Sequence, residues 1–333
     1  MNICFHIGQA KTGTTAIQKC FSKNRQELLG MGFLYPKSVF GGNNHGVMAI
    51  PIMGFVQRTL KSKVGADYDR ALDAAHEAWA AAAQEARQTR PHTIIISSEF
   101  FFKARNVREI SQIVERHFGT VSEMTFLAYV RRPSQHYVSF MQQQLRANHR
   151  VPVLKVDPIL EQLVKYSEIG EVRVQRFSRE SMYDGDVTHD ICEKLGVDFV
   201  KLKPNPAEQN VSLSAEGTIV LQQYRRDRHR NRNNVFTEDT HDLIRQILRE
   251  EAEHHGGYTK LCLRPEIAQA LDRDTPEMHE IRSRFGVDLS HDYNASAMPE
   301  SELSKLTDVA QMVAYDPALL QRMHEVTGQR HDI

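Results

Sequence analysis

The chain has 333 residues, which is enough for two domains of ordinary size or for one large domain with additions. Apolar residues make up 41% and charged residues 25%, the composition of an ordinary soluble globular protein. The 42 basic residues balance the 42 acidic ones, and this zero net charge argues against a protein that coats nucleic acid.

The sequence contains no stretch long and apolar enough to span a membrane, and its first residues, MNICFHIG, do not form a signal peptide. The four cysteines are far apart and include no CxxC pair, which argues against a zinc site or a disulfide framework. We therefore expect reduced thiols and a cytoplasmic location without integral membrane association.

Strand and helix patterns alternate through the first half of the chain. Short apolar or β-branched runs predict strands at 3–7, 93–97, 124–130 and 171–177. Apolar residues at helical spacing predict helices at about 14–26, 67–88, 107–114 and 133–148, and one that includes 159–164. This alternation predicts an α/β fold in three layers, with a mostly parallel sheet between helices.

The strand pattern fades from about Lys203. Helical patterns fill residues 212–255 and parts of 265–285 and 300–325. We expect a single domain over residues 1–333, with an α/β core at about 1–203 and a helical C-terminal extension at about 204–333.

The strongest motif is HIGQAKTGTTAIQ at residues 6–18, where a strand, a glycine-containing loop and a helix follow one another. Such a loop directs backbone N–H groups at one point, and the helix dipole adds positive potential there. Lys11 adds a charge, the hydroxyls of Thr14 and Thr15 add donors, and Gly13 allows close backbone approach. These features indicate a loop that binds a phosphate-like group, in preference to an ordinary strand-to-helix turn without a ligand.

The loop is not a Walker A motif, because its lysine precedes Gly13 by two residues instead of following the last glycine. It resembles instead the 5′-phosphosulfate loop of sulfotransferases that use 3′-phosphoadenosine 5′-phosphosulfate (PAPS). The resemblance rests on GxxKTGTTxxQ at Gly8–Gln18. It implies a P-loop-like fold and a loop, Lys11, Thr12, Gly13, Thr14 and Thr15, that binds the 5′ end of the donor.

A second motif of that family is present in LAYVRRPSQHYVSF at 127–140, where Arg131 ends a strand and Ser139 follows eight residues later. The resemblance implies that both bind the 3′-phosphate of PAPS and of its product, adenosine 3′,5′-bisphosphate (PAP). A guanidinium suits this role because it binds phosphate with two parallel hydrogen bonds. Arg132 is either a second phosphate contact or a salt-bridged surface residue, and we favour the second.

Two residues are candidates for the base that takes the acceptor's proton. Glu99 follows a buried strand, at the end of the sheet where α/β proteins bind ligands, and the SSE segment resembles the site of a catalytic glutamate in glycan and protein sulfotransferases. The alternative is His45 in the GGNNHG loop, since imidazole titrates near neutral pH. Lys11 supplies positive charge to the leaving phosphate.

Five arginines lie in YRRDRHRNRNN at 224–234. They form either a basic rim for an anionic acceptor or cofactor, or a solvated helix end paired with nearby acidic residues, and we slightly favour the second because charge runs are usually solvated. Nucleic-acid binding is a poor third interpretation, since no aromatic residues are interleaved.

The chain is thus identified as a suspected bacterial PAPS-dependent sulfotransferase, closer to the carbohydrate and glycan type than to the cytosolic small-molecule type, whose RKG loop it lacks. The expected acceptor is a hydroxyl of a carbohydrate, glycan or small molecule, and the reaction needs no metal. Two other hypotheses stay open: a P-loop-type small-molecule kinase, and a non-catalytic protein that binds PAP or a glycan. The oligomeric state, including a homodimer, is also open.

Overall fold

The computed structural model describes residues 1–204 and 212–328. Contacts divide the described residues into two compact units, an α/β unit and a helical unit. The α/β unit takes its residues from Met1–Arg131, Pro158–Glu208 and Pro276–Asp288, and the helical unit from Arg132–Asp157, Gln209–Thr275 and Leu289–Ile333. The chain therefore passes between the units more than once, whereas the sequence predicted one division near residue 203.

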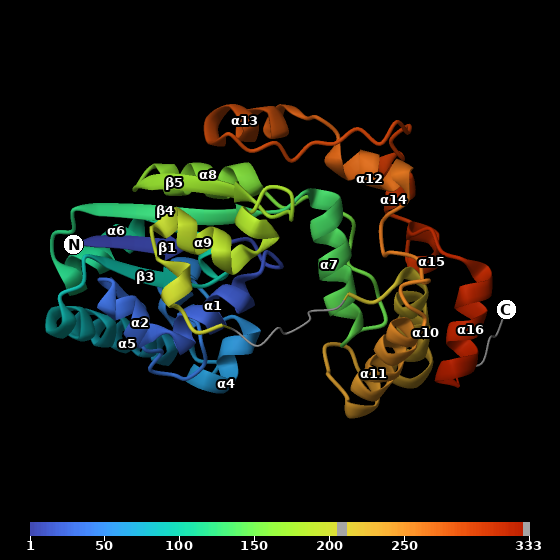
Figure 1. Cartoon of the computed structure of the whole chain (residues 1–333), viewed down its shortest axis with the longest axis horizontal. Coiled ribbons are helices and arrows are strands. Elements are labelled where there is room, and N and C mark those ends of the chain that lie inside the picture. Colours follow the sequence, from blue (N-terminus) through green and yellow to red (C-terminus); the bar gives the residue numbers. More distant parts are fainter. Residues whose placement is uncertain (205–211, 329–333) are drawn as a thin grey trace. The chain divides into compact units, whose positions relative to one another are not determined.

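A parallel sheet of five strands forms the centre of the α/β unit. Its strands are β1 (Asn2–His6), β2 (Phe33–Leu34), β3 (Thr93–Ser97), β4 (Glu123–Val130) and β5 (Glu171–Arg176). They lie in the order β2-β3-β1-β4-β5, and every pair is parallel. Figure 1 shows β5, β4, β1 and β3 side by side in this order. The predicted α/β class and parallel sheet are confirmed.

Alternate residues of β1 face opposite layers of helices. Phe5 packs on Trp79 of α5 and on Phe101, while its neighbour Phe126 on β4 packs on Tyr166 of α8. Cys4 belongs instead to a buried cluster that contains side chains of α1, α2 and α9. Because side chains alternate along a strand, adjacent apolar residues bury both faces of the sheet.

The helices of the α/β unit follow the strands in the alternation that the sequence predicted. They are α1 (Thr14–Lys23), α2 (Arg25–Gly30), α3 (Ile50–Met53), α4 (Lys61–Val64), α5 (Tyr68–Thr89), α6 (Arg108–Phe118), α8 (Ile159–Ser167), α9 (Val187–Leu195) and α13 (Pro276–Phe285). The expected helix at 14–26 is two helices, because Asn24 turns the chain between α1 and α2. β2 was not predicted, since two residues carry no periodicity.

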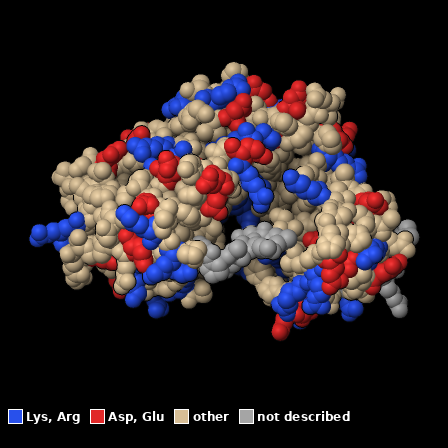
Figure 2. Space-filling model, viewed as in Figure 1, with Lys and Arg blue, Asp and Glu red and all other residues tan. Residues whose placement is uncertain are grey.

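The helical unit packs around one apolar cluster. Its helices are α7 (Pro133–Leu145), α10 (Ala215–His229), α11 (Glu238–Glu253), α12 (Pro265–Asp272), α14 (Glu300–Leu303), α15 (Val309–Met312) and α16 (Pro317–Thr327). None of the helices in the described ranges has the length and apolarity needed to cross a membrane. Figure 2 shows acidic and basic side chains interspersed over the face in view, as the balanced charge leads one to expect.

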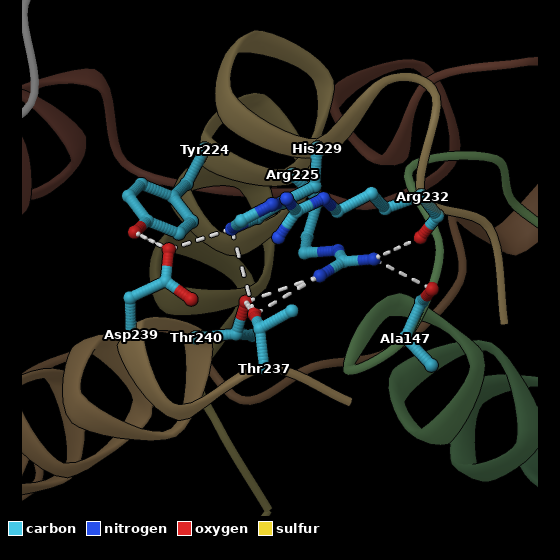
Figure 3. A network of polar contacts seen from close by, with 8 residues as sticks. All are labelled: Ala147, Tyr224, Arg225, His229, Arg232, Thr237, Asp239 and Thr240. Carbon is cyan, nitrogen blue, oxygen red and sulfur yellow. Dashed lines mark hydrogen bonds and ion pairs between the residues drawn. The ribbon is translucent and has the colours of Figure 1, made fainter. Parts of the chain in front are cut away.

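A fully buried arginine is the centre of a polar network in the helical unit (Figure 3). The Arg225 guanidinium donates to the carbonyls of Ala147 (2.6 Å) and Arg232 (2.8 Å), and to the hydroxyl of Thr240 (3.2 Å). The interpretation of the whole arginine run as solvated is therefore wrong for Arg225. Burial lowers the pKa of Arg225. Carbonyl and hydroxyl oxygens accept from both of its terminal nitrogens, while its Nε has no hydrogen-bond partner among the described residues.

Arg132 is also buried, where the sequence predicted a surface residue. It lies 4.0 Å from the carboxylate of Asp272, which accepts hydrogen bonds from the backbone N–H and hydroxyl of Ser134 and from the hydroxyl of Tyr293. The expected ion pair is thus present, but it lies at the start of α7 inside the helical unit.

Replacing Arg225 with Met should destabilise the helical unit by about 2–4 kcal/mol, because buried carbonyl groups lose their donors. Arg226→Met is the matched control, since Arg226 is only half-buried and pairs with Asp308. Urea unfolding followed by circular dichroism measures both changes. Equal losses for the two variants would contradict a special role for the buried guanidinium.

Candidate functional site

The loops after β1 and β4 leave the sheet toward opposite edges. From β1 the chain goes on to β2 at one edge, and from β4 it goes on to β5 at the other, while β1 and β4 are neighbours. In open parallel sheets, ligands bind at such a point, outside the carboxyl ends of the strands. The loop at residues 7–13 and Arg131 both lie there.

Backbone and side-chain hydrogen bonds hold the loop after β1 against the end of β4. Gln9 donates its N–H to the carbonyl of Tyr129 (2.9 Å), so pairing with β4 continues beyond the strand. The side-chain oxygen of Gln9 accepts from the N–H of Arg131 (3.1 Å), and its carbonyl accepts from the hydroxyl of Thr12 (2.6 Å). Gln9 thus fixes two of the predicted ligand-binding residues, a role that the sequence did not reveal.

The loop turns into α1 through two residues with left-handed backbone conformation. Lys11 has φ 68° and Gly13 has φ 76°. A side chain at Gly13 would lie 2.7 Å from Val187 and 3.0 Å from Phe177, so both conformation and space require glycine. Lys11 is a strained non-glycine residue, and such strain is frequent in ligand-binding loops.

The first turn of α1 receives no hydrogen bond from a capping side chain. Its leading N–H groups and its dipole therefore form the kind of positive pole that binds anions. Thr14 is buried there, while the side chain of Thr15 is exposed. Thr12 is fully buried, and its hydroxyl binds within the loop.

Arg131 lies beside the loop with part of its guanidinium unsatisfied. Its Nη1 reaches the carbonyl of Lys11 at 3.5 Å, and its Cζ lies 5.5 Å from the ring centroid of Phe177. The buried Nε has no hydrogen-bond partner, and burial lowers the pKa of Arg131. Among the described residues, no carboxylate forms an ion pair with it.

Phe177 is a site residue that sequence reasoning missed. It follows β5 as Arg131 follows β4, and the two strands are paired in register, with the N–H of Phe177 donating to the carbonyl of Val130 (2.7 Å). Its ring therefore reaches both Arg131 and Gly13. The sequence shows an aromatic residue after a strand, but only the strand order brings it to the loop.

Glu99 follows β3 and is connected to α1 by a hydrogen bond. The side-chain amide of Gln18 donates to the Glu99 carboxylate at 3.3 Å. Gln18 is buried and lies one turn beyond Thr14, while Glu99 is half-buried. Lys11, Arg131 and Glu99 therefore belong to the same end of the sheet. Gln18 was part of the motif, but its partner was not foreseen.

Backbone groups occupy both ring nitrogens of His45. Nδ1 accepts the N–H of Ser97 (2.9 Å), so Nε2 carries the proton that is donated to the carbonyl of Pro36 (2.9 Å). His45 is buried, and burial lowers its pKa to about 4. In this arrangement His45 joins its loop to the end of β3.

His6 is a second buried histidine, also linked to Ser97. Its Nδ1 lies 2.8 Å from the Ser97 hydroxyl, and its Nε2 has no partner. Burial lowers its pKa to about 3. Both histidines are therefore neutral at pH 7 and support the strand ends beneath the loop.

Ser139 lies two turns into α7, in the helical unit, and is half-buried. Its pairing with Arg131 stays a prediction. Within the described ranges, no group of three or more His, Cys, Asp or Glu side chains is arranged to hold a metal ion.

Comparison with models of protein families, with curated proteins and with solved structures found no match to the chain.

The two buried histidines make stability depend on pH. Their pKa values are about 3 and about 4 in the native state, against roughly 6.5 when unfolded, so the unfolded chain binds more protons below pH 6.5. The free energy of unfolding should therefore fall as pH decreases from about 6.5 to 4, with each histidine contributing up to about 1.4 kcal/mol per pH unit.

Urea unfolding at several pH values measures this slope. His45→Gln should reduce it, because glutamine does not take up a proton, whereas the same substitution at the exposed His291 should not. An unchanged slope in His45→Gln would contradict the neutral, buried state of His45.

Proposed function

We propose that the protein is a sulfotransferase that moves the sulfuryl group of PAPS to a hydroxyl of a carbohydrate or glycan-like acceptor. The observation that carries the proposal is the incompletely satisfied guanidinium of Arg131 beside an uncapped helix start. Arg225 shows that carbonyl oxygens can stabilise a buried guanidinium, but within the described ranges the guanidinium of Arg131 has only one long hydrogen bond, of 3.5 Å, and a bound anion would supply the missing acceptors. Two positive poles on adjacent loops suit a donor that is anionic at both ends.

In the proposed complex, Lys11 and the backbone of residues 10–15 hold the 5′-phosphosulfate, and P-loop-like geometry is part of the proposal. Thr14 and Thr15 assist, while Thr12 keeps the loop in shape through Gln9. Arg131 holds the 3′-phosphate, with Ser139 as its proposed partner. Phe177 keeps the guanidinium of Arg131 in place by lying against it.

The reaction needs a base for the acceptor and positive charge for the leaving group. The acceptor oxygen attacks sulfur, the sulfur–oxygen bond to the phosphate of PAP breaks, and the hydroxyl proton passes to Glu99. Lys11 offsets the charge that develops on the departing oxygen. Glu99 is preferred to His45 as the base because both nitrogens of His45 are bound to backbone groups.

A cytoplasmic location is part of the same proposal. The four cysteines are free thiols, and three of them are buried. Burial raises the pKa of Cys4 to about 12 and of Cys20 to about 11, which makes these thiols unreactive. Free thiols suit the reducing cytoplasm.

Donor binding tests the proposal directly. PAP should raise the melting temperature more than ATP with magnesium does, because a ligand stabilises the native state that binds it. Arg131→Gln should weaken PAP by about 10- to 100-fold and adenosine 5′-phosphosulfate much less, since a hydrogen bond to a charged group contributes about 1.5–3 kcal/mol. Arg173→Gln, on exposed β5 surface, is the control.

Two results of that comparison would end the proposal for the donor. Stabilisation by ATP with magnesium but not by PAP would favour the kinase hypothesis. If Arg131→Gln weakens the binding of PAP and of adenosine 5′-phosphosulfate equally, Arg131 does not bind the 3′-phosphate.

Turnover tests the base. Glu99→Gln should lower kcat by about 10²- to 10⁴-fold while PAP still binds, because the substitution removes proton acceptance and keeps the shape of the side chain. A labelled donor and a panel of hydroxyl acceptors provide the assay, and Glu115→Gln on exposed α6 surface is the control. If His45→Gln abolishes turnover and Glu99→Gln does not, His45 is the base.

A further inference from the structure

An exposed basic and apolar surface lies at the end of α10. We call it the arginine surface, and it consists of Arg150, Arg228, Arg230, Arg232, Val235 and Phe236. Phe236 is 58% exposed and Val235 is 45% exposed, although both are large apolar side chains. In the described part of the chain, no salt bridge is formed by the four arginines, whereas neighbouring Arg226 is paired with Asp308.

Hydrogen bonds from the buried Arg225 and from neighbouring residues hold the backbone of this surface in place. Arg225 binds the carbonyls of Arg232 and Ala147, as Figure 3 shows, and the N–H of Val235 donates to the same Ala147 carbonyl (3.3 Å). Asn148 and Asn234 exchange two further hydrogen bonds, of 2.9 and 3.2 Å. The exposed groups are thus presented on an ordered segment, so binding a ligand there loses little backbone entropy.

Arg150 and Arg230 of this surface, together with Arg226, lie near the same histidine. The pKa of nearby His149 is lowered first by burial and then by the charges of Arg150, Arg226 and Arg230. Unpaired cations held together on an ordered backbone attract an anionic partner. The exposed ring of Phe236 adds an apolar contact, so the partner has both negative groups and an apolar face.

The neighbouring acidic residues narrow the class of partner. Asp227 precedes Arg228 in the sequence, Glu238 and Asp239 follow Phe236 closely, and all three are exposed, while the net charge of the chain is zero. A membrane or a nucleic acid presents a broad negative potential that these carboxylates would repel. A shorter anionic ligand, bound by short-range contacts to the arginines, would not come close to all three carboxylates.

We propose that the arginine surface binds an acidic glycan. Guanidinium groups pair with its carboxylate or sulfate groups through two parallel hydrogen bonds. The negative face of the Phe236 ring lies against the C–H groups of a sugar ring. That the bound glycan is the sulfate acceptor rests on the proposed function. That the arginine surface binds an acidic glycan does not.

Calorimetric titration without any donor tests the inference. The probes are hexasaccharides of heparin, which carries sulfate and carboxylate, of hyaluronan, which carries carboxylate alone, and of neutral dextran. An acidic hexasaccharide should bind, dextran should not, and the better acidic probe identifies the recognised group. Arg230→Gln with Arg232→Gln should weaken binding at least 10-fold and flatten its dependence on salt.

A matched pair of variants separates this surface from general charge. Arg245→Gln with Arg249→Gln removes the same charge from exposed positions of α11 and should leave affinity within about 2-fold. Phe236→Ser should weaken binding without changing its salt dependence, because it removes an uncharged contact. Melting temperatures confirm that each variant is folded.

Three results would overturn the inference. The first is that no acidic hexasaccharide binds, and the second is that the two double arginine substitutions weaken binding equally. The third is that a single-stranded oligonucleotide or phosphatidylserine vesicles bind more tightly than the glycans. Because PAP binding and turnover are measured separately, failure here leaves the donor site standing. Glycan binding without PAP binding would instead leave a glycan-binding protein that is not a sulfotransferase.

Discussion

The parallel pairing of β1 with β4 is the constraint from which the candidate site follows. It places the loop after the first strand beside a residue more than a hundred positions later, and it does so through backbone hydrogen bonds that continue past the strand to Gln9. The two strands send their chains to opposite edges of the sheet, which is the arrangement at which open parallel sheets bind ligands. Lys11 lies on one of these loops and Arg131 on the other.

The sequence predicted most of the α/β unit because its strands are buried on both faces. Continuous apolar runs such as TIIIS at 93–97 carry a strong pattern, and the structure has β3 at Thr93–Ser97. β2 has only two residues and carries no pattern. The exchange of segments between the two units was also beyond prediction, since periodicity shows that a helix forms but not where it packs.

The candidate site was foreseen where residue chemistry is local and missed where it depends on contacts. Lys11, Gly13 and Thr14 belong to one short motif, and the loop brings them together. The partners of Glu99 and Arg131, by contrast, are Gln18 and Phe177, which only strand order places near them. The contacts of His45 could not be foreseen either, because the sequence shows a histidine in a loop but not the backbone groups that its ring nitrogens bind, and its role as the alternative base stays a prediction.

The position of Phe177 has a consequence for how donor preference can change. One ring lies near Gly13 of the first loop and near the guanidinium of Arg131, so the two halves of the proposed donor site share one support. Substituting that ring would loosen both halves together. If Arg131 binds the 3′-phosphate as proposed, evolution toward a donor without a 3′ group would begin more easily at Arg131 than at Phe177, and the aromatic residue should change more slowly than the arginine.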